Sequence, residues 1–269
     1  MINTIYIEKE ISNHYRTKRI LTKFPKKHII HINHYGEIFN KKKQNFRLQK
    51  KNQSLIIAKK SNQFVIKTPE NSFISKNRLN FYFSHMYNCI YDCKYCYLQG
   101  LFASSNYVIF INYEDFFEEI KRKIIDNKNK KITFFSGYDC DSLALEKITG
   151  FLSEMLPEFK KHEDAELEIR TKSASLYPFN KINPANNLIL AYSLLPENIS
   201  YNLDIKTPSI KKRLQTIFKL SKIGWKIGLR FDPLIFYLRW KEDYSELFSI
   251  IKNNLSPQSI HSITFGSLR

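Results

Sequence analysis

From about residue 80 onward, short apolar runs alternate with stretches of helical periodicity, and few folds are compatible with this alternation. The apolar runs predict six main strands, over residues 78–85, 131–137, 165–172, 186–194, 225–234 and 262–269. Apolar side chains at helical spacing predict helices over residues 113–127, 141–159, 207–224 and 241–255. Strands joined through helices run parallel in one sheet, so we predict an α/β fold of about six strand–helix units, arranged as a complete or incomplete barrel.

The segment before this pattern has a different composition. Residues 1–78 are rich in Lys and Asn, with only short strand-like runs at residues 55–58 and 64–67. We therefore predict two parts, a small basic N-terminal segment over residues 1–78 that packs on or flanks the barrel, and the barrel over residues 79–269. The aromatic side chains of the segment either stack on nucleic-acid bases or pack on the barrel, and the sequence supports both.

The formal net charge of +18 at pH 7 indicates the kind of partner. A surplus of this size favours a polyanion, because bound phosphates are neutralised by Lys and Arg. A coding bias toward Lys, Asn and Ile would produce the same charge without a function. We expect a nucleic-acid partner.

The apolar runs are too short for a membrane protein. The longest, such as residues 55–58 and 233–238, are far below the roughly 20 residues that a membrane span needs. The N-terminal residues lack the apolar stretch of a signal peptide. We expect a cytoplasmic protein without a membrane anchor, in which cysteines stay reduced.

Polar side chains follow the predicted strands. In a barrel of parallel strands the chemistry gathers at the carboxyl ends of the strands. The candidate site positions there are Cys89–Cys96, Ser136–Ser142, Arg170–Lys172, Ser193, Asp204–Lys206 and Asp232. We expect Asp232 to pair with Arg230 or Lys206.

Cys89, Cys93 and Cys96, three of the four cysteines, lie within eight residues at the spacing C-x3-C-x2-C. Thiolates bind soft metals, so zinc and an iron–sulfur cluster are the candidates. A structural zinc site closes with four protein ligands, and the fourth would have to be His85 or the distant Cys140. A four-iron cluster with three cysteine ligands leaves one iron open for a cofactor, so it needs no fourth ligand.

This spacing, with Tyr95 just before the third cysteine, resembles the signature of the radical S-adenosylmethionine superfamily. The resemblance implies a 4Fe-4S cluster on Cys89, Cys93 and Cys96 whose open iron binds S-adenosylmethionine, and a 5'-deoxyadenosyl radical made from that cofactor. It also implies the partial (β/α)6 TIM-like barrel of that superfamily and an external electron donor of the flavodoxin or ferredoxin type.

Further stretches are similar to the spore photoproduct lyase family and occur in the order of that family. They are CKYCYLQG (93–100), ELEIRTKS (166–173), TPSIKKRL (207–214), ITFGSLR (263–269) and the stretches 45–60, 141–157 and 231–237. The resemblance covers the chain from about residue 35 to its end. It implies a monomeric carbon–carbon lyase that reverses a thymine dimer formed in DNA by ultraviolet light.

The resemblance also implies roles for individual residues in the reaction. Cys140 corresponds to a cysteine that supplies a hydrogen atom, and Tyr95 and Tyr97 correspond to tyrosines that pass the radical back to the cofactor. Ordinary packing is the alternative for all three. If residues 141–157 are aligned with the family without gaps, Cys140 lies about two residues away from the position of the family's donor cysteine. The role of Cys140 therefore stays open.

Contacts with S-adenosylmethionine are implied in the same way. Lys172 and Ser193 match positions that contact this cofactor, and we place Ser136 and Ser142 as further contacts. The family's lyases continue past the last strand with a hairpin that inserts near the lesion, and this sequence stops at Arg269.

Two alternatives stay open. One is an enzyme of the same family that acts on a different nucleic-acid or small-molecule substrate. The other is a non-catalytic, zinc-bearing nucleic-acid-binding protein.

Overall fold

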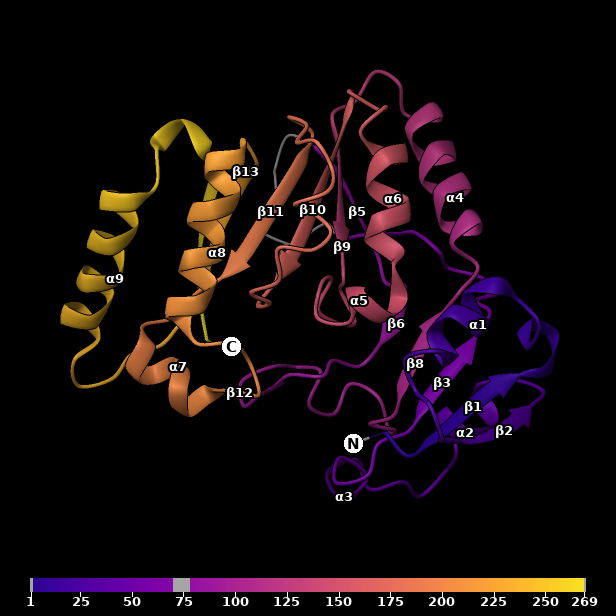
Figure 1. Ribbon diagram of the computed structural model, residues 1–269. Helices are drawn as coiled ribbons and strands as arrows, with labels where there is room; N and C mark the ends of the chain where they lie inside the picture. The colour runs from indigo at the N-terminus through magenta and orange to yellow at the C-terminus, as the bar shows by residue number, and fades with distance from the viewer. Residues whose placement is uncertain (1, 70–77, 269) are drawn as a thin grey trace.

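Six parallel strands form the main sheet of the computed structural model, which describes residues 2–69 and 78–268 (Figure 1). In sheet order they are β14 (Ile260–Ser267), β13 (Lys226–Leu234), β11 (Leu188–Ser193), β10 (Ala165–Thr171), β9 (Ile132–Ser136) and β5 (Leu79–Phe83). The short β4 (Ile66–Lys67) adds an antiparallel edge beside β5. Among the described residues β14 and β4 do not pair with each other, so the barrel is open and the predicted partial (β/α)6 architecture is confirmed.

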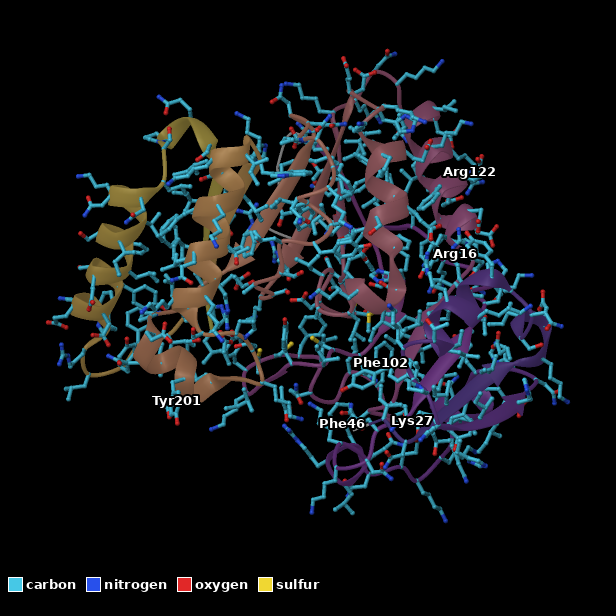
Figure 2. The ribbon with its side chains drawn as sticks, viewed as in Figure 1. Arg16, Lys27, Phe46, Phe102, Arg122 and Tyr201 are labelled. Atoms are coloured by element: carbon cyan, nitrogen blue, oxygen red, sulfur yellow. The ribbon has the colours of Figure 1, made fainter. Side chains whose placement is uncertain are left out.

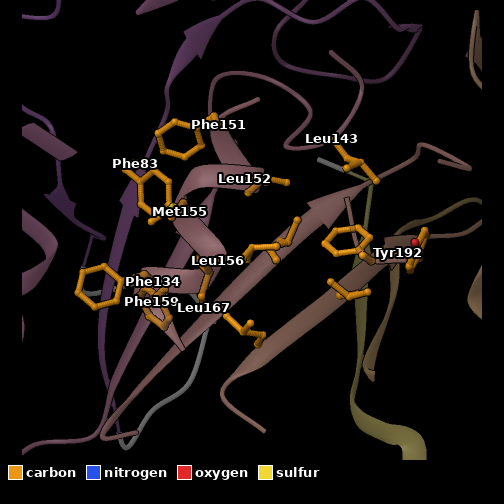
Figure 3. Close-up of a cluster of buried hydrophobic side chains, with 14 of the residues drawn as sticks. Phe83, Phe134, Leu143, Phe151, Leu152, Met155, Leu156, Phe159, Leu167 and Tyr192 are labelled. Atoms are coloured by element: carbon orange, nitrogen blue, oxygen red, sulfur yellow. The ribbon is translucent and has the colours of Figure 1, made fainter. Parts of the chain in front are cut away.

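Helices cover one face of this barrel sheet. They are α4 (Tyr113–Ile125), α6 (Phe151–Phe159), α8 (Ile210–Ile223) and α9 (Trp240–Asn254). Figure 3 shows the core under α6, where Leu152, Met155 and Leu156 pack close to Phe134 and Leu167 of the sheet. Residues of all four helices and of β5, β9, β10, β11 and β13 belong to one buried apolar cluster, which holds the barrel together. β14 packs against this cluster through the partly buried Ile260.

The helix predicted over residues 141–159 is divided into α5 (Glu146–Thr149) and α6. Gly150 separates them with a left-handed φ of +65°, a conformation that favours glycine. A Cβ at this position would also lie 2.8 Å from Nη2 of Arg19. The chain therefore turns at Gly150 before the longer helix starts.

The opposite face of the barrel sheet, its inner face, carries polar side chains. Arg230 of β13 forms an ion pair with Glu168 of β10, with Nη2 2.7 Å from Oε2. The guanidinium fits because the neighbouring Gly228 has no side chain, since a Cβ there would lie 2.7 Å from Nη2 of Arg230. Asp232 is exposed, and in the described part of the chain it forms no ion pair with Arg230 or Lys206, so the expected pairing is wrong.

The N-terminal segment forms a second sheet (Figure 1). Its parallel strands, in order, are β2 (His28–Ile32), β1 (Thr4–Glu8), β3 (Leu55–Ala58) and β8 (Tyr107–Phe110), and β6 (Met86–Tyr87) is an antiparallel edge. The shorter helices here are η1 (Lys9–Ile11), α1 (Tyr15–Leu21), α2 (Gly36–Phe39) and α3 (Phe46–Gln49).

Strand pairing crosses the predicted boundary at residue 78 in both directions. β8 and β6 lie after this position and join the N-terminal sheet, whereas β4 lies before it and joins the barrel sheet. The division into residues 1–78 and 79–269 stays a prediction. No helix in the described part of the chain is long and apolar enough to cross a bilayer.

Candidate active site

The three clustered cysteines lie on a loop that starts and ends in the N-terminal sheet and forms a small two-stranded sheet with β12 (Asp204–Ile205). This cysteine loop, residues 88–106, connects β6 to β8. Asn88 closes its base with a left-handed φ of +65°, and the Asn88 side-chain amide donates to the carbonyls of Ser104 at 2.8 Å and Asn106 at 2.7 Å. In the middle of the loop, β7 (Asp92–Cys93) pairs antiparallel with β12, which follows α7 (Glu197–Leu203).

The thiols of Cys89, Cys93 and Cys96 lie close enough for their charges to interact. Burial raises the pKa of the Cys93 thiol to about 12, and the ammonium of Lys172 opposes this increase. Burial also raises the pKa of Cys89 above its usual range. These two thiols are protonated at neutral pH when nothing is bound, so a metal is what would hold them as thiolates.

The donor set is compatible with a cluster of several irons. Within residues 2–69 and 78–268, no three His, Cys, Asp or Glu side chains converge closely enough to hold one metal ion. A zinc ion needs all its ligands at about 2.0–2.3 Å from one centre, whereas the cysteines of a four-iron cluster bind separate irons. His85, the possible fourth zinc ligand, is stacked on Phe151 with ring centroids 4.2 Å apart.

Asp204 links the cysteine loop to the barrel. It accepts a hydrogen bond from the Tyr95 hydroxyl at 2.5 Å and pairs with Arg213 of α8 at 2.8 Å. The Asp204 and Arg213 side chains are both fully buried. Burial alone would raise the pKa of the Asp204 carboxyl, but Lys172, Arg213 and the Tyr95 hydroxyl outweigh it and hold this pKa below its usual range.

Lys172 directs its charge toward the cysteine loop. Its ammonium lies 5.3 Å from the centroid of the Tyr95 ring and acts on both Cys93 and Asp204. The Lys172 backbone is fixed by Asp141, which accepts from the Lys172 N–H and from the Thr171 hydroxyl, each at 2.7 Å. The end of β10 is thereby joined to the loop that follows β9.

Ser136 and Ser142 form a tight turn after β9. The Ser136 hydroxyl donates to the Ser142 hydroxyl at 2.6 Å, which donates to the Ser136 carbonyl at 2.8 Å. Gly137 between them has a φ of +72°, and a Cβ there would lie 2.4 Å from Oγ of Ser142. The two hydroxyls hold the turn, and cofactor contact by either one stays a prediction.

Ser193 is buried at the end of β11, on the inner face of the barrel sheet. Its carbonyl accepts a hydrogen bond from Nη1 of Arg213 at 3.1 Å. Because Arg213 also binds Asp204, the end of β11 is coupled to Tyr95 through two side chains.

Cys140 and Tyr97 have opposite environments. The Cys140 side chain is 6% exposed and packs among the apolar side chains of the N-terminal sheet, including Met86 and Ile109. Burial raises the pKa of its thiol far above the usual range, and the nearby Cys89 thiol raises it further. Tyr97 is 55% exposed, and its hydroxyl donates to the carbonyl of Tyr138. The donor role of Cys140 and the radical-relay role of Tyr95 and Tyr97 stay predictions.

Arg213 was missed in the sequence because its stretch, residues 210–214, reads as a basic and solvent-exposed helix start. Only the fold shows that Arg213 is buried against Asp204. The fold thus brings Lys172 close to the loop that carries Tyr95 and the three clustered cysteines, and Asp204 and Arg213 support this loop.

The comparisons with known proteins agree on one family. A family model described as "Spore photoproduct lyase" matches residues 1–269. The chain is 25% identical over 174 residues to a spore photoproduct lyase from Clostridium acetobutylicum, and 22% identical over 178 residues to one from Bacillus subtilis. These matches cover 64% and 66% of this chain. Each covers 52% of the relative, so the chain matches about half the length of these curated relatives.

The fold is similar to that of a solved spore photoproduct lyase double mutant with bound AdoMet and dinucleoside spore photoproduct. The TM-score is 0.86 at 16% sequence identity, over 100% of this chain and 79% of that chain. At this identity the likeness shows a shared fold.

Proposed function

The chain belongs to the spore photoproduct lyase family, and from this premise we propose that it is a radical S-adenosylmethionine carbon–carbon lyase that reverses a thymine dimer formed in DNA by ultraviolet light. The proposed cofactors are a 4Fe-4S cluster and S-adenosylmethionine, which together supply a 5'-deoxyadenosyl radical when bound. An external electron donor, a monomeric state and a cytoplasmic location belong to the same proposal.

In this proposal Cys89, Cys93 and Cys96 hold the cluster. Lys172 and Ser193 hold S-adenosylmethionine, since both lie at carboxyl ends of barrel strands, and Lys172 directs its ammonium toward the cysteine loop. Tyr95 anchors the loop through Asp204, and Ser136 and Ser142 shape the turn beside it.

One observation supports this function above the others. The C-x3-C-x2-C loop is pinned to the barrel by β7 and β12, and Lys172 lies near enough to Cys93 to oppose the increase that burial causes in the pKa of that thiol. A zinc-bearing binding protein has no need for a lysine directed toward its metal ligands from the end of a barrel strand.

The first experiment tests the cluster. The protein is purified without oxygen, reconstituted with iron and sulfide, and analysed for both elements and for zinc. We expect about four irons per chain in the wild type and a large loss in Cys93→Ala. Cys140→Ala is the matched control, because it removes a buried thiol outside the spacing and should keep its iron. Zinc without iron in the wild type would overturn both enzyme proposals.

The second experiment tests the substrate. The dithionite-reduced protein is incubated with S-adenosylmethionine and an oligonucleotide that contains spore photoproduct, and the restored thymine is measured by mass spectrometry. Restored thymine supports the lyase. Cleavage of S-adenosylmethionine without restored thymine would instead support a family member with another substrate. Altered products from Cys140→Ala would support its role as the hydrogen donor.

A further inference from the structure

We infer that Tyr138, stacked on Tyr82 and placed beside Tyr97, is a platform for an unpaired nucleobase next to the cysteine loop. This inference deepens the proposed function and rests on it. We refer to Tyr82, Tyr97 and Tyr138 as the tyrosine platform.

Tyr82 supports this platform from below. Side chains alternate along β5, and Phe81 and Phe83 are buried in the apolar core on the helix-covered face of the sheet. Tyr82 therefore points to the inner face of the barrel sheet. Because it is the penultimate residue of β5, its ring lies close to the carboxyl end, where the candidate site is located.

The Tyr138 ring lies over the Tyr82 ring. Gly137, at φ +72°, turns the chain directly after β9 and places the next residue above the sheet end. The rings of Tyr138 and Tyr82 are stacked, with centroids 4.2 Å apart and an angle of 28° between their planes. One face of Tyr138 is thus covered by protein, yet 43% of the residue is exposed.

Tyr97 completes the platform from the cysteine loop. Its hydroxyl donates to the Tyr138 carbonyl, and its ring centroid lies 5.8 Å from that of Tyr138 at an angle of 50°. Tyr97 directly follows Cys96, and both Cys96 and Cys140 lie near enough to act on its hydroxyl. A base on Tyr138 would therefore lie beside the candidate cluster ligands.

An exposed aromatic group at this position indicates a nucleobase as the ligand. Every base has a π-face, and stacking on an aromatic side chain contributes about 1–3 kcal/mol per base. An enzyme that acts on a base must remove it from the helix stack at a cost of a few kcal/mol, which such stacking offsets. The formal charge of +18 favours the phosphate backbone of the same ligand.

The test measures binding of a fluorescein-labelled single-stranded thymidine oligonucleotide to the reconstituted protein by fluorescence anisotropy. Stacking of 1–3 kcal/mol corresponds to a roughly 5- to 150-fold increase in Kd for Tyr138→Ala. Tyr138→Phe keeps the ring and should bind within about twofold of the wild type. Tyr138→Leu keeps an apolar contact with Tyr82 but has no ring, so it should resemble Tyr138→Ala.

Tyr201→Ala is the matched control. Tyr201 is 84% exposed on α7 (Figure 2), and no ring contact involves it in the described part of the chain. Wild-type affinity in Tyr138→Ala, or weak binding in Tyr138→Phe, would overturn the platform. Cleavage of S-adenosylmethionine by the same preparations distinguishes the platform from the proposed function. If the wild type binds the oligonucleotide but contains no iron and does not cleave S-adenosylmethionine, only the proposed function is contradicted.

Discussion

The hydroxyl of Tyr95 lies 2.5 Å from a carboxylate oxygen of Asp204, and this contact joins the cysteine loop to the barrel. Asp204 is fully buried with Arg213, so Tyr95 is the residue through which the loop reaches a paired internal charge. Hydrogen bonds to a buried charge are stronger than bonds between neutral groups. The phenol of Tyr95 therefore adds a side-chain anchor to the backbone pairing of β7 with β12.

Tyr95→Phe removes this hydroxyl and keeps the ring. We expect the free energy of unfolding to fall by about 2 kcal/mol, because Asp204 loses one of the donors that stabilise its charge. Urea unfolding followed by circular dichroism measures the change. Tyr201→Phe removes an exposed hydroxyl and should have no effect. Equal stability of Tyr95→Phe and the wild type would mean that the contact does not anchor the loop.

Gly137→Ala tests the turn that holds Ser136 and Ser142. Alanine at φ +72° is strained, and its Cβ would lie 2.4 Å from Oγ of Ser142, so the turn must shift. Gly100→Ala is the matched control, since Gly100 has a φ of +137° but nothing within 4 Å of the new Cβ. We expect a loss of more than about 1 kcal/mol for Gly137→Ala, larger than for Gly100→Ala, by urea unfolding. Similar losses in both variants would show that backbone strain alone determines the effect.

The barrel could be predicted from the sequence because the patterns that specify it lie within short stretches of the chain. Barrel strands such as Ile132–Ser136 are short apolar runs with a helix before or after them in the chain, and the three clustered cysteines are close in the chain. The N-terminal sheet could not be predicted, because β1 pairs with β3 about fifty residues later. The support of the site was missed for another reason. Asp204 and Arg213 are nine residues apart, but residues 210–214 read as an exposed basic helix start, and only the docking of α8 on the sheet buries Arg213 against Asp204.

Arg16 joins the N-terminal sheet to the barrel helices, and its loss should weaken the whole fold. Its Nη2 lies 2.6 Å from Glu114 of α4 and 2.5 Å from Glu154 of α6, and its side chain is 3% exposed. We expect Arg16→Met to lower the free energy of unfolding by roughly 3 kcal/mol, because two carboxylates lose their buried partner. The measurement is urea unfolding.

The control for Arg16 is an arginine that also pairs with glutamate but lies on the surface. Arg122 on α4 is 62% exposed and pairs with Glu119 (Figure 2 labels both arginines). Exposed ion pairs contribute little, so Arg122→Met should leave the unfolding curve unchanged. Comparable effects of the two variants would contradict a joining role for Arg16.

His85 should make stability depend on pH in the range where histidines titrate. Burial lowers its pKa to about 3 from an ordinary value of 6.5. Between these values the unfolded chain binds a proton that the folded chain does not. Stability therefore falls as the pH drops below 6.5, by up to about 1.4 kcal/mol per pH unit, and His85 contributes no such change above it.

The measurement is the free energy of urea unfolding from pH 7.5 to pH 5. This window avoids Glu168 and Asp204, whose folded pKa values are lowered below 4.5 and 3.8, so the stability they contribute is lost only at more acidic pH. His85→Phe keeps a ring against Phe151 and should flatten the slope, whereas His28→Gln, at an exposed position, should keep it. A slope in His85→Phe as steep as in the wild type would show that another group carries the pH dependence.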